Sequence, residues 1–441
     1  MSGGLIALIL AGGAARGAYE VGVVLHILSE VAKDIGRPVP LDILCGTSVG
    51  AINACTLAAH AEEPARRAEV LVQQWTGLRL DQVARPSRSE ILGLIAGLVG
   101  RKRSPPGPGE VRRGGLLDPR GIEAIVRQAI VPDGIRRNLA AGHLHALTVS
   151  TTDVASGRTI IFLQRKDPAL PEWSHDPTIS VRTAQISAEH ALASAAVPLL
   201  FPAVRIDGNF YCDGGLRQNV PLSPARRLGA DGLIVVNPRF IPPDSPPPEV
   251  ARERERDYPG PFFLFGKALN ALLLDRIDAD IDRLNRINLI LEAGVRRFGP
   301  HFVTELNREL GGQRRVRGLK RLRVVHIRAS EDIGTMAAAY AKTPEFAQRA
   351  TGTIGKIIRR ISEWEGAGDA DLLSYILFDG EFSARLIELG RNDARARHSE
   401  LCAFFEALAP KGALRPSAGA PEAAPSDGNA GGRDGTGTTG D

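Results

Sequence analysis

The first sixty residues alternate short apolar runs with glycine turns and helical patterns, and this alternation restricts the fold most. An apolar run at 4–11 (GLIALILA) leads into the glycine-rich stretch 12–17 (GGAARG). Apolar residues then recur at helical spacing over 21–35, a second strand pattern spans 41–45, and small residues fill a helical stretch at 49–60. Short continuous apolar runs are typical of strands covered on both faces. The order strand, helix, strand, helix predicts an α/β sheet.

Later segments continue this pattern. Strands are predicted at 144–151, 158–163, 232–237 and, late in the chain, 322–328. Residues 204–215 are predicted to form a hairpin, because two short runs flank an Asp-Gly turn dipeptide. We therefore expect a three-layer α/β/α domain with a mostly parallel central sheet, plus a helical C-terminal region.

Composition shifts predict the domain boundaries. The α/β domain is expected over 5–240, followed by a proline-rich, charged linker or surface excursion at 241–260. Residues 261–409 are predicted to be mostly helical, with the late strand inside them. The tail 410–441 holds almost no large apolar side chains, which predicts disorder.

Composition excludes several classes of protein. Of 441 residues, 43% are hydrophobic and 24% charged, which is the balance of a globular protein rather than a collagen-like, disordered or multi-span membrane chain. The net charge of +5 comes without a long basic block, so we expect no nucleic-acid partner. The first apolar run lacks a preceding Lys or Arg, and no run is long enough to span a bilayer. We expect a cytoplasmic protein.

The sequence Gly46-Thr47-Ser48-Val49-Gly50 is a G-x-S-x-G motif in a suitable context. An apolar strand enters Ser48 and a helix of small residues leaves it, and this strand–turn–helix geometry exposes a nucleophilic hydroxyl. The alternative is an ordinary serine that caps a helix N-terminus. Context favours a nucleophile.

The stretch 12–17 also lies between a strand and a helix, where backbone amides favour negative charge. A dinucleotide-binding loop would need glycine at Ala14 and an acidic residue at the end of the next strand. Asp42 instead begins that strand. An oxyanion hole is therefore favoured over a dinucleotide site.

A nucleophilic serine needs a base. The histidines are scattered, with His143 and His145 on one predicted strand. The best-placed carboxylate is Asp213, at the end of a hairpin strand and before Gly214 and Gly215, although a turn-forming role would explain its position equally well. Asp153 is a weaker candidate, with a hairpin-stabilising role as its alternative.

These three blocks together resemble the patatin-like phospholipase family. The shared motifs are G-G-x-x-R-G, G-T-S-x-G and D-G-G, in that order, and the stretches 151–162 and 191–225 are also similar to the family. The resemblance covers roughly residues 5–240. One departure is Ala14, where many members carry a third glycine.

The resemblance implies a Ser–Asp dyad without histidine, in which Ser48 is the nucleophile and Asp213 accepts its proton. It further implies no metal and no cofactor. Arg16 is expected to organise the loop or contact an anion. The oxyanion hole and the supporting motif glycines would be Gly12, Gly13, Ala14, Ala15, Arg16 and Gly17, with Gly46, Gly50, Gly214 and Gly215.

The predicted function is ester hydrolysis of lipid acyl chains, on a phospholipid or lysophospholipid substrate. Two alternatives stay open: an acyltransferase that uses the same acyl-enzyme, and a non-catalytic nucleotide- or anion-binding regulatory module. The oligomeric state and the need for an activating protein are left open.

An apolar run at 91–99, with basic residues on both sides, predicts a surface lid that settles on an anionic membrane. A core helix with solvated charged ends is the alternative. The run 262–274 is a second candidate for membrane contact or for a dimer interface.

Overall fold

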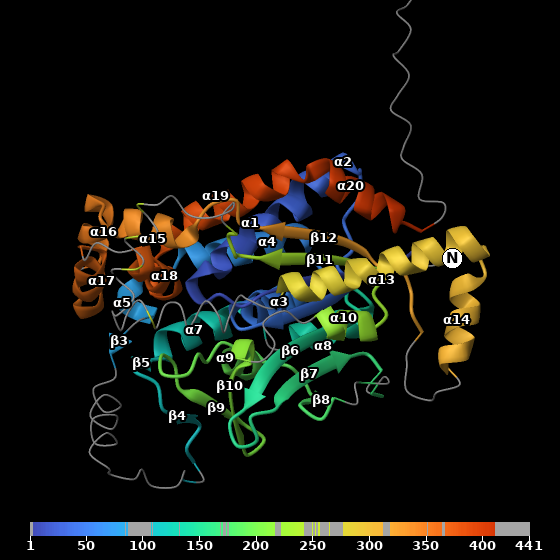
Figure 1. Ribbon diagram of the computed structural model, residues 1–441. Helices are drawn as coiled ribbons and strands as arrows, with labels where there is room; N and C mark the ends of the chain where they lie inside the picture. Colours follow the sequence, from blue (N-terminus) through green and yellow to red (C-terminus); the bar gives the residue numbers. More distant parts are fainter. Residues whose placement is uncertain are drawn as a thin grey trace, which may run out of the picture.

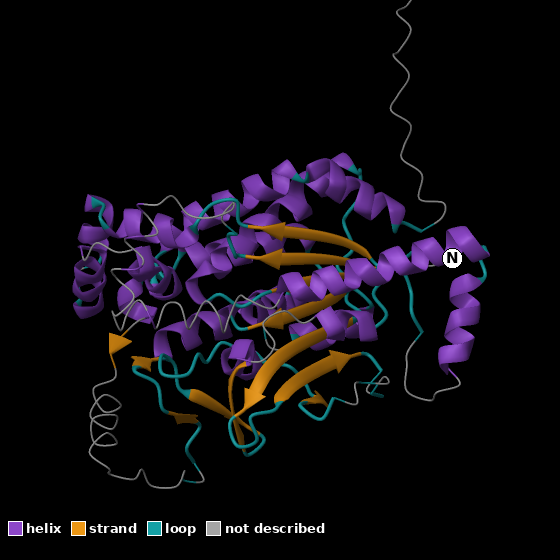
Figure 2. Ribbon diagram, viewed as in Figure 1, coloured by secondary structure: helices purple, strands orange, loops and turns teal. Residues whose placement is uncertain are grey.

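A ten-stranded mixed sheet organises the described part of the computed structural model (Figures 1 and 2). The structure describes residues 3–83, 85–86, 107, 109–131, 133–167, 169–170, 173, 176–216, 222–241, 249, 252, 255, 264, 277–311, 318–350, 352–363 and 367–410. The sheet order along its main path is β12 (Arg323–Arg328), β11 (Gly232–Asn237), β1 (Ile6–Leu10), β2 (Ile43–Thr47), β6 (Ala146–Asp153), β10 (Asn209–Asp213), β9 (Ala203–Ile206) and β4 (Arg112–Arg113). Off this path, β7 (Thr159–Arg165) pairs with β6 and with β8 (Ile179–Thr183), and β3 (Arg85–Pro86) and β5 (Leu117–Asp118) form a separate pair.

The strands from β12 to β6 run parallel to one another. Every residue of β1, β2 and β11 is buried, because helices cover both faces of the sheet. Alternate residues enter different cores: Leu8 and Leu10 pack on one face, Ala7 and Ile9 on the other. Because these strands are buried on both faces, their sequences are short, continuous apolar runs.

The other half of the sheet is mostly antiparallel, and the parallel pair β7–β8 is its exception. β10 pairs antiparallel with both β9 and β6, and β7 pairs antiparallel with the other edge of β6. The hairpin between β9 and β10 turns at Asp207 and Gly208, whose φ angles are 47° and 85°. Two consecutive positive φ values are the mark of the tight turns that join twisted strands.

On one face of the sheet, α1 (Gly17–His26) continues through a π-helical segment (Ile27–Val31) into α2 (Ala32–Asp34). α1 packs against α19 (Gly380–Ala396). The two helices approach so closely that a Cβ at Gly22 would lie 1.9 Å from the Ile387 carbonyl oxygen. Glycine at this position therefore lets a helix from the C-terminal region sit directly on the first helix of the chain.

The remaining described helices surround the sheet (Figure 1). They are α3 (Val49–Ala59), α4 (Pro64–Thr76), α5 (Leu80–Val83), α7 (Arg120–Ala129), α8 (Gly134–Ala141), α9 (Ala188–Ser194), α10 (Leu222–Arg227), α13 (Ile277–Phe298), α14 (Phe302–Gly311), α15 (Ile333–Ala341), α16 (Pro344–Arg349), α17 (Thr353–Glu363), α18 (Ala367–Ile376) and α20 (His398–Ala407). No helix among the described residues is long and apolar enough to cross a bilayer.

The predicted three-layer α/β fold class is confirmed, and its central sheet is mixed. The late strand predicted near 322–328 is β12, and it pairs with β11 at the edge of the main sheet. The proposed domain boundaries stay predictions. Most of the linker 241–260 and of the run 262–274, together with the whole run 91–99 and the tail beyond residue 410, lies outside the described residues.

Candidate active site

The candidate site lies where β1 and β2 end. These strands are parallel neighbours, so the loop after Leu10 and the turn after Thr47 emerge side by side at the carboxyl edge of the sheet. The loop 12–17 leads into α1 and the turn leads into α3. A Cβ at Gly50 would lie 2.4 Å from the Leu10 carbonyl oxygen, so only glycine lets the start of α3 come this close to the loop.

Ser48 occupies a strained backbone conformation. Its φ is 55° and its ψ is −132°, a combination that non-glycine residues rarely adopt. The Ser48 N–H donates to Ser194 Oγ at 2.8 Å, and Ser194 Oγ donates in turn to the Ser150 carbonyl oxygen at 2.6 Å. These bonds hold the turn in place from α9 and β6.

The hydroxyl of Ser48 donates to a carboxylate. The distance from Ser48 Oγ to Asp213 Oδ2 is 2.6 Å, and both residues are fully buried. The second oxygen, Asp213 Oδ1, accepts from the Gly215 N–H at 2.7 Å. The strand that carries Asp213 is fixed by its register opposite Thr151 of β6 and by a bond from the Asp213 N–H to the Ala196 carbonyl oxygen at 3.0 Å.

Burial raises the pKa of Asp213 to about 7, although the bonds from Ser48 and Gly215 act in the opposite direction. A carboxyl group with this pKa is a far better proton acceptor near neutral pH than an exposed aspartate. Asp153, the weaker sequence candidate, is occupied elsewhere: its Oδ1 accepts from the Ser156 N–H at 2.7 Å and from Ser156 Oγ at 2.6 Å.

The residues of the loop 12–17 are all buried and form a short 3-10 turn before α1. Ala14 has a φ of 48°, in the left-handed region that favours glycine. The third glycine common in the family therefore corresponds to a position of real backbone strain in this chain. The loop ends beside the serine turn, since a Cβ at Gly17 would meet the Val49 side chain at 2.7 Å.

The side chain of Arg16 points toward the C-terminal region rather than solvent. Its Nε donates to Ser374 Oγ at 2.8 Å, and its guanidinium lies 3.4 Å from Asp371 and 4.2 Å from the centre of the Tyr375 ring. All three partners belong to α18. The loop is therefore anchored to a helix that follows it by more than three hundred residues in the sequence.

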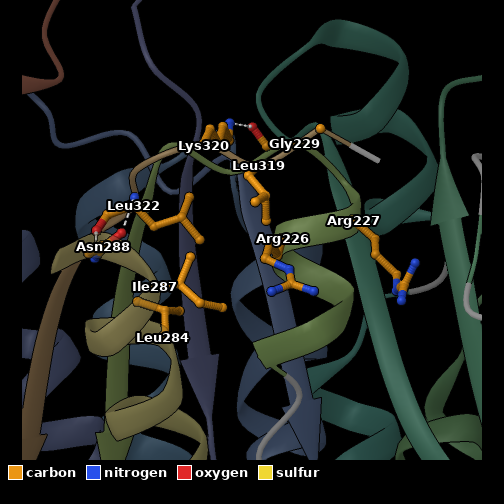
Figure 3. A pocket seen from close by; sticks show the side chains of 10 residues that line it. Arg226, Arg227, Gly229, Leu284, Ile287, Asn288, Leu319, Lys320 and Leu322 are labelled. Atoms are coloured by element: carbon orange, nitrogen blue, oxygen red, sulfur yellow. Dashed lines mark hydrogen bonds between the residues drawn. The ribbon is translucent and has the colours of Figure 1, made fainter. Parts of the chain in front are cut away.

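The cavity drawn in Figure 3 lies at the opposite, amino edge of the sheet. Arg226, Asn288 and Lys320 are among the residues that line its volume of about 330 Å³. Lys320 Nζ donates to the Gly229 carbonyl oxygen at 2.7 Å, and the Asn288 amide exchanges two hydrogen bonds with the Leu322 backbone. The Asn288 bonds tie α13 to the entry of β12, and the Lys320 bond ties that entry to the turn after α10.

Residues 8–226 match the model of the patatin-like phospholipase family. The chain belongs to this family. A curated relative, the cGAMP-activated phospholipase of Pseudomonas aeruginosa, is 28% identical over 217 residues, which are 48% of this chain and 53% of that protein. The chain thus matches only about half the length of this relative.

Two solved structures show weaker likeness. VipD from Legionella pneumophila is 13% identical, with a TM-score of 0.33 over 91% of this chain and 67% of that one. The ExoU–SpcU complex of Pseudomonas aeruginosa gives 15% identity and a TM-score of 0.25, over 82% of this chain and 83% of that one. Family membership rests on the sequence match.

Sequence reasoning missed Ser194. It lies within the stretch 191–225 that resembles the family, but a serine in an alanine-rich helix gives no local signal of contact with the nucleophile. Across the described residues, no cluster of His, Cys, Asp or Glu side chains could hold a metal ion.

Proposed function

We propose that this chain is a serine-type lipid acyl hydrolase in which Ser48 is the nucleophile, Asp213 the base and the backbone amides of loop 12–17 the oxyanion hole. The observation that carries the proposal is the bond of 2.6 Å from Ser48 Oγ to the buried Asp213 carboxylate. Membership of the patatin-like phospholipase family supports lipid hydrolysis as the class of reaction.

In the acylation step, Ser48 Oγ attacks the ester carbonyl carbon while its proton moves to Asp213 Oδ2. The carbonyl oxygen becomes an oxyanion that the loop amides and the N-terminus of α1 stabilise. The intermediate collapses, the bond to the alcohol breaks, and the leaving alkoxide takes the proton from Asp213. An acyl-Ser48 ester and a free alcohol result.

In the deacylation step, Asp213 takes a proton from water as the water oxygen attacks the acyl carbon. The second tetrahedral intermediate releases Ser48, which recovers the proton, and the fatty acid leaves. The base is suited to both steps because burial brings its pKa to about 7 and Gly215 fixes its orientation.

The experiment that tests this proposal compares hydrolysis of a phospholipid and lysophospholipid panel by the wild type and by Ser48→Ala. Ser48→Ala should lose both hydrolysis and labelling by a fluorophosphonate probe, which reacts only with an activated serine. Ser362→Ala, which removes another buried serine hydroxyl, serves as the matched control and should keep both. Undiminished hydrolysis by folded Ser48→Ala would exclude Ser48 as the nucleophile.

The same assays separate the alternatives. If the chain is an acyltransferase, added glycerol or lysolipid should become acylated. If it is a non-catalytic regulatory module, it should not react with the fluorophosphonate probe. Each assay is run with and without cGAMP, because the Pseudomonas aeruginosa relative is named as activated by that molecule.

We further propose a cytoplasmic enzyme that meets its lipid substrate at a peripheral membrane surface.

A further inference from the structure

A buried polar group lies directly behind the loop 12–17 and belongs neither to the dyad nor to the loop. It consists of Glu20 of α1, Asn53 of α3 and Trp75 of α4, none of which is more than 4% exposed. Three polar side chains from three helices meet there. Such buried groups are retained when their hydrogen bonds fix a geometry.

The orientation of the Asn53 amide follows from its partners. Trp75 Nε1 can only donate, and it donates to Asn53 Oδ1 at 2.8 Å. The amino group of Asn53 therefore faces the loop, where Nδ2 donates to Glu20 Oε2 at 2.9 Å and to the Gly17 carbonyl oxygen at 3.1 Å. A single indole N–H thus sets which way the amide points.

The group holds the end of the loop that leads into α1. Gly17, which closes the loop, is bound by Asn53, and Asn53 is bound in turn to Glu20. Burial raises the pKa of Glu20 well above its usual range. A glutamine at this position would therefore preserve both the shape and the neutral state of the side chain.

We propose that Glu20, Asn53 and Trp75 are positioning residues that clamp the Gly17 end of loop 12–17 and so set the spacing of the oxyanion-hole amides. The proposal rests on the proposed function. Oxyanion donors act only when they lie about 2.7–3.1 Å from the developing charge. The loop cannot hold that geometry by itself, because Ala14 is strained and the flanking glycines are free to relax.

Trp75→Phe tests the clamp because it removes the N–H that orients Asn53, together with the outer ring atoms nearest Gly17. The pair Glu20→Gln and Glu20→Met isolates the contribution of the hydrogen bonds. With a soluble p-nitrophenyl ester, kcat should fall about 10- to 100-fold while KM stays within about twofold, as expected when a catalytic geometry is displaced. Binding of a trifluoromethyl ketone, whose hemiketal oxyanion occupies the hole, should weaken by the same factor as kcat/KM.

The matched control is Thr56→Val. Thr56 Oγ1 donates to Gln74 Oε1 at 3.2 Å, so this variant removes a hydrogen bond between the same two helices without touching the loop. Both variants should lower Tm, Trp75→Phe by more because it also removes buried ring volume, but only Trp75→Phe should lower kcat. At the other end of the group, Glu20→Gln should retain much more kcat than Glu20→Met, because only glutamine keeps an acceptor for Asn53.

Two outcomes would overturn the inference. If Trp75→Phe lowers Tm as Thr56→Val does and keeps kcat, the group is a packing element only. If Glu20→Met and Glu20→Gln have equal kcat, the carboxyl oxygen is not part of the clamp. A wild type that neither hydrolyses esters nor reacts with fluorophosphonate overturns the proposed function as well, whereas a labelled and active wild type leaves that function standing whatever the clamp variants do.

Discussion

The parallel and antiparallel halves of the sheet contribute different parts of the candidate site by different means. The parallel half supplies Ser48 and the loop 12–17, both at turns from a strand into a helix. The antiparallel half supplies Asp213 at the end of β10, where hairpin register opposite β6 fixes its position. The strand–helix turns supply a strained backbone and the N-termini of helices. The register of a strand fixes how far along the sheet a side chain such as Asp213 lies. The site needs both.

The largest expected effect comes from removing the contribution of the antiparallel half. Asp213→Asn keeps the size of the side chain and an acceptor for the Gly215 N–H but removes the base, so kcat should fall by about 10²–10⁴. Steady-state kinetics on a soluble ester measures this, with circular dichroism to verify the fold. An active Asp213→Asn together with an essential histidine in an alanine scan would replace the dyad with a Ser–His pair.

The pH dependence sharpens the same comparison. Because burial raises the pKa of Asp213 to about 7, kcat/KM should rise about tenfold per pH unit below 7 and level off above it. A profile that levels off near pH 4–5 would mean that Asp213 titrates as an exposed carboxylate.

The same shift predicts a stability effect of definite sign. The folded state holds the Asp213 proton more tightly than the unfolded state, so the stability of the wild type should fall as pH rises from about 4 to 7. Above pH 7, Asp213→Asn lacks this buried charge, so its free energy of unfolding should exceed that of the wild type by about 1–4 kcal/mol. Chemical denaturation at pH 5 and 8 checks this, and equal pH slopes for the two proteins would contradict it.

A smaller effect is expected from the anchor of the loop in the parallel half. Arg16→Gln removes the contacts with Asp371 and the Tyr375 ring, and kcat should fall about tenfold through a looser oxyanion loop. A double-mutant cycle with Ser374→Ala measures whether the two residues act through one contact. Additive effects of the two substitutions would show that they do not.

The smallest effect concerns the strain of the same loop. Ala14→Gly removes the cost of a left-handed alanine, offset in part by a freer unfolded chain, and should stabilise the protein by about 0.5–1 kcal/mol. Ala15→Gly, one residue later and without a positive φ, is the control and should destabilise. Thermal denaturation of both variants measures this difference. If both substitutions shift Tm equally, backbone strain at Ala14 does not affect stability.

The parallel half could be predicted from the sequence because its signals are local. The apolar run of β1, the G-x-S-x-G turn and the small residues of α3 lie next to one another in the chain. The position of Asp213 was predictable as a strand end, but the hairpin pattern does not say that β10 pairs with β6, which makes the sheet mixed.

Contacts between distant side chains could not be predicted in the same way. Ser194, Glu20 and Trp75 have ordinary local patterns, and their roles follow from helices that meet only in three dimensions. The π-helical segment at 27–31 could not be predicted from the sequence either, because one extra residue in a helix barely changes its apolar spacing.

The anchoring of Arg16 by α18 has a consequence for how the protein is made. Arg16 and Ser374 are 358 residues apart, and at about 5–20 residues per second a ribosome needs roughly 20–70 s to synthesise the chain between them. α19 packs against α1 over a similar span, and β11 pairs with β1 through Gly232 and Ile6, which gives the domain a high contact order. The nascent chain therefore carries an unanchored loop 12–17 during most of its synthesis, and the geometry of the candidate site can form only after α18 has left the ribosome.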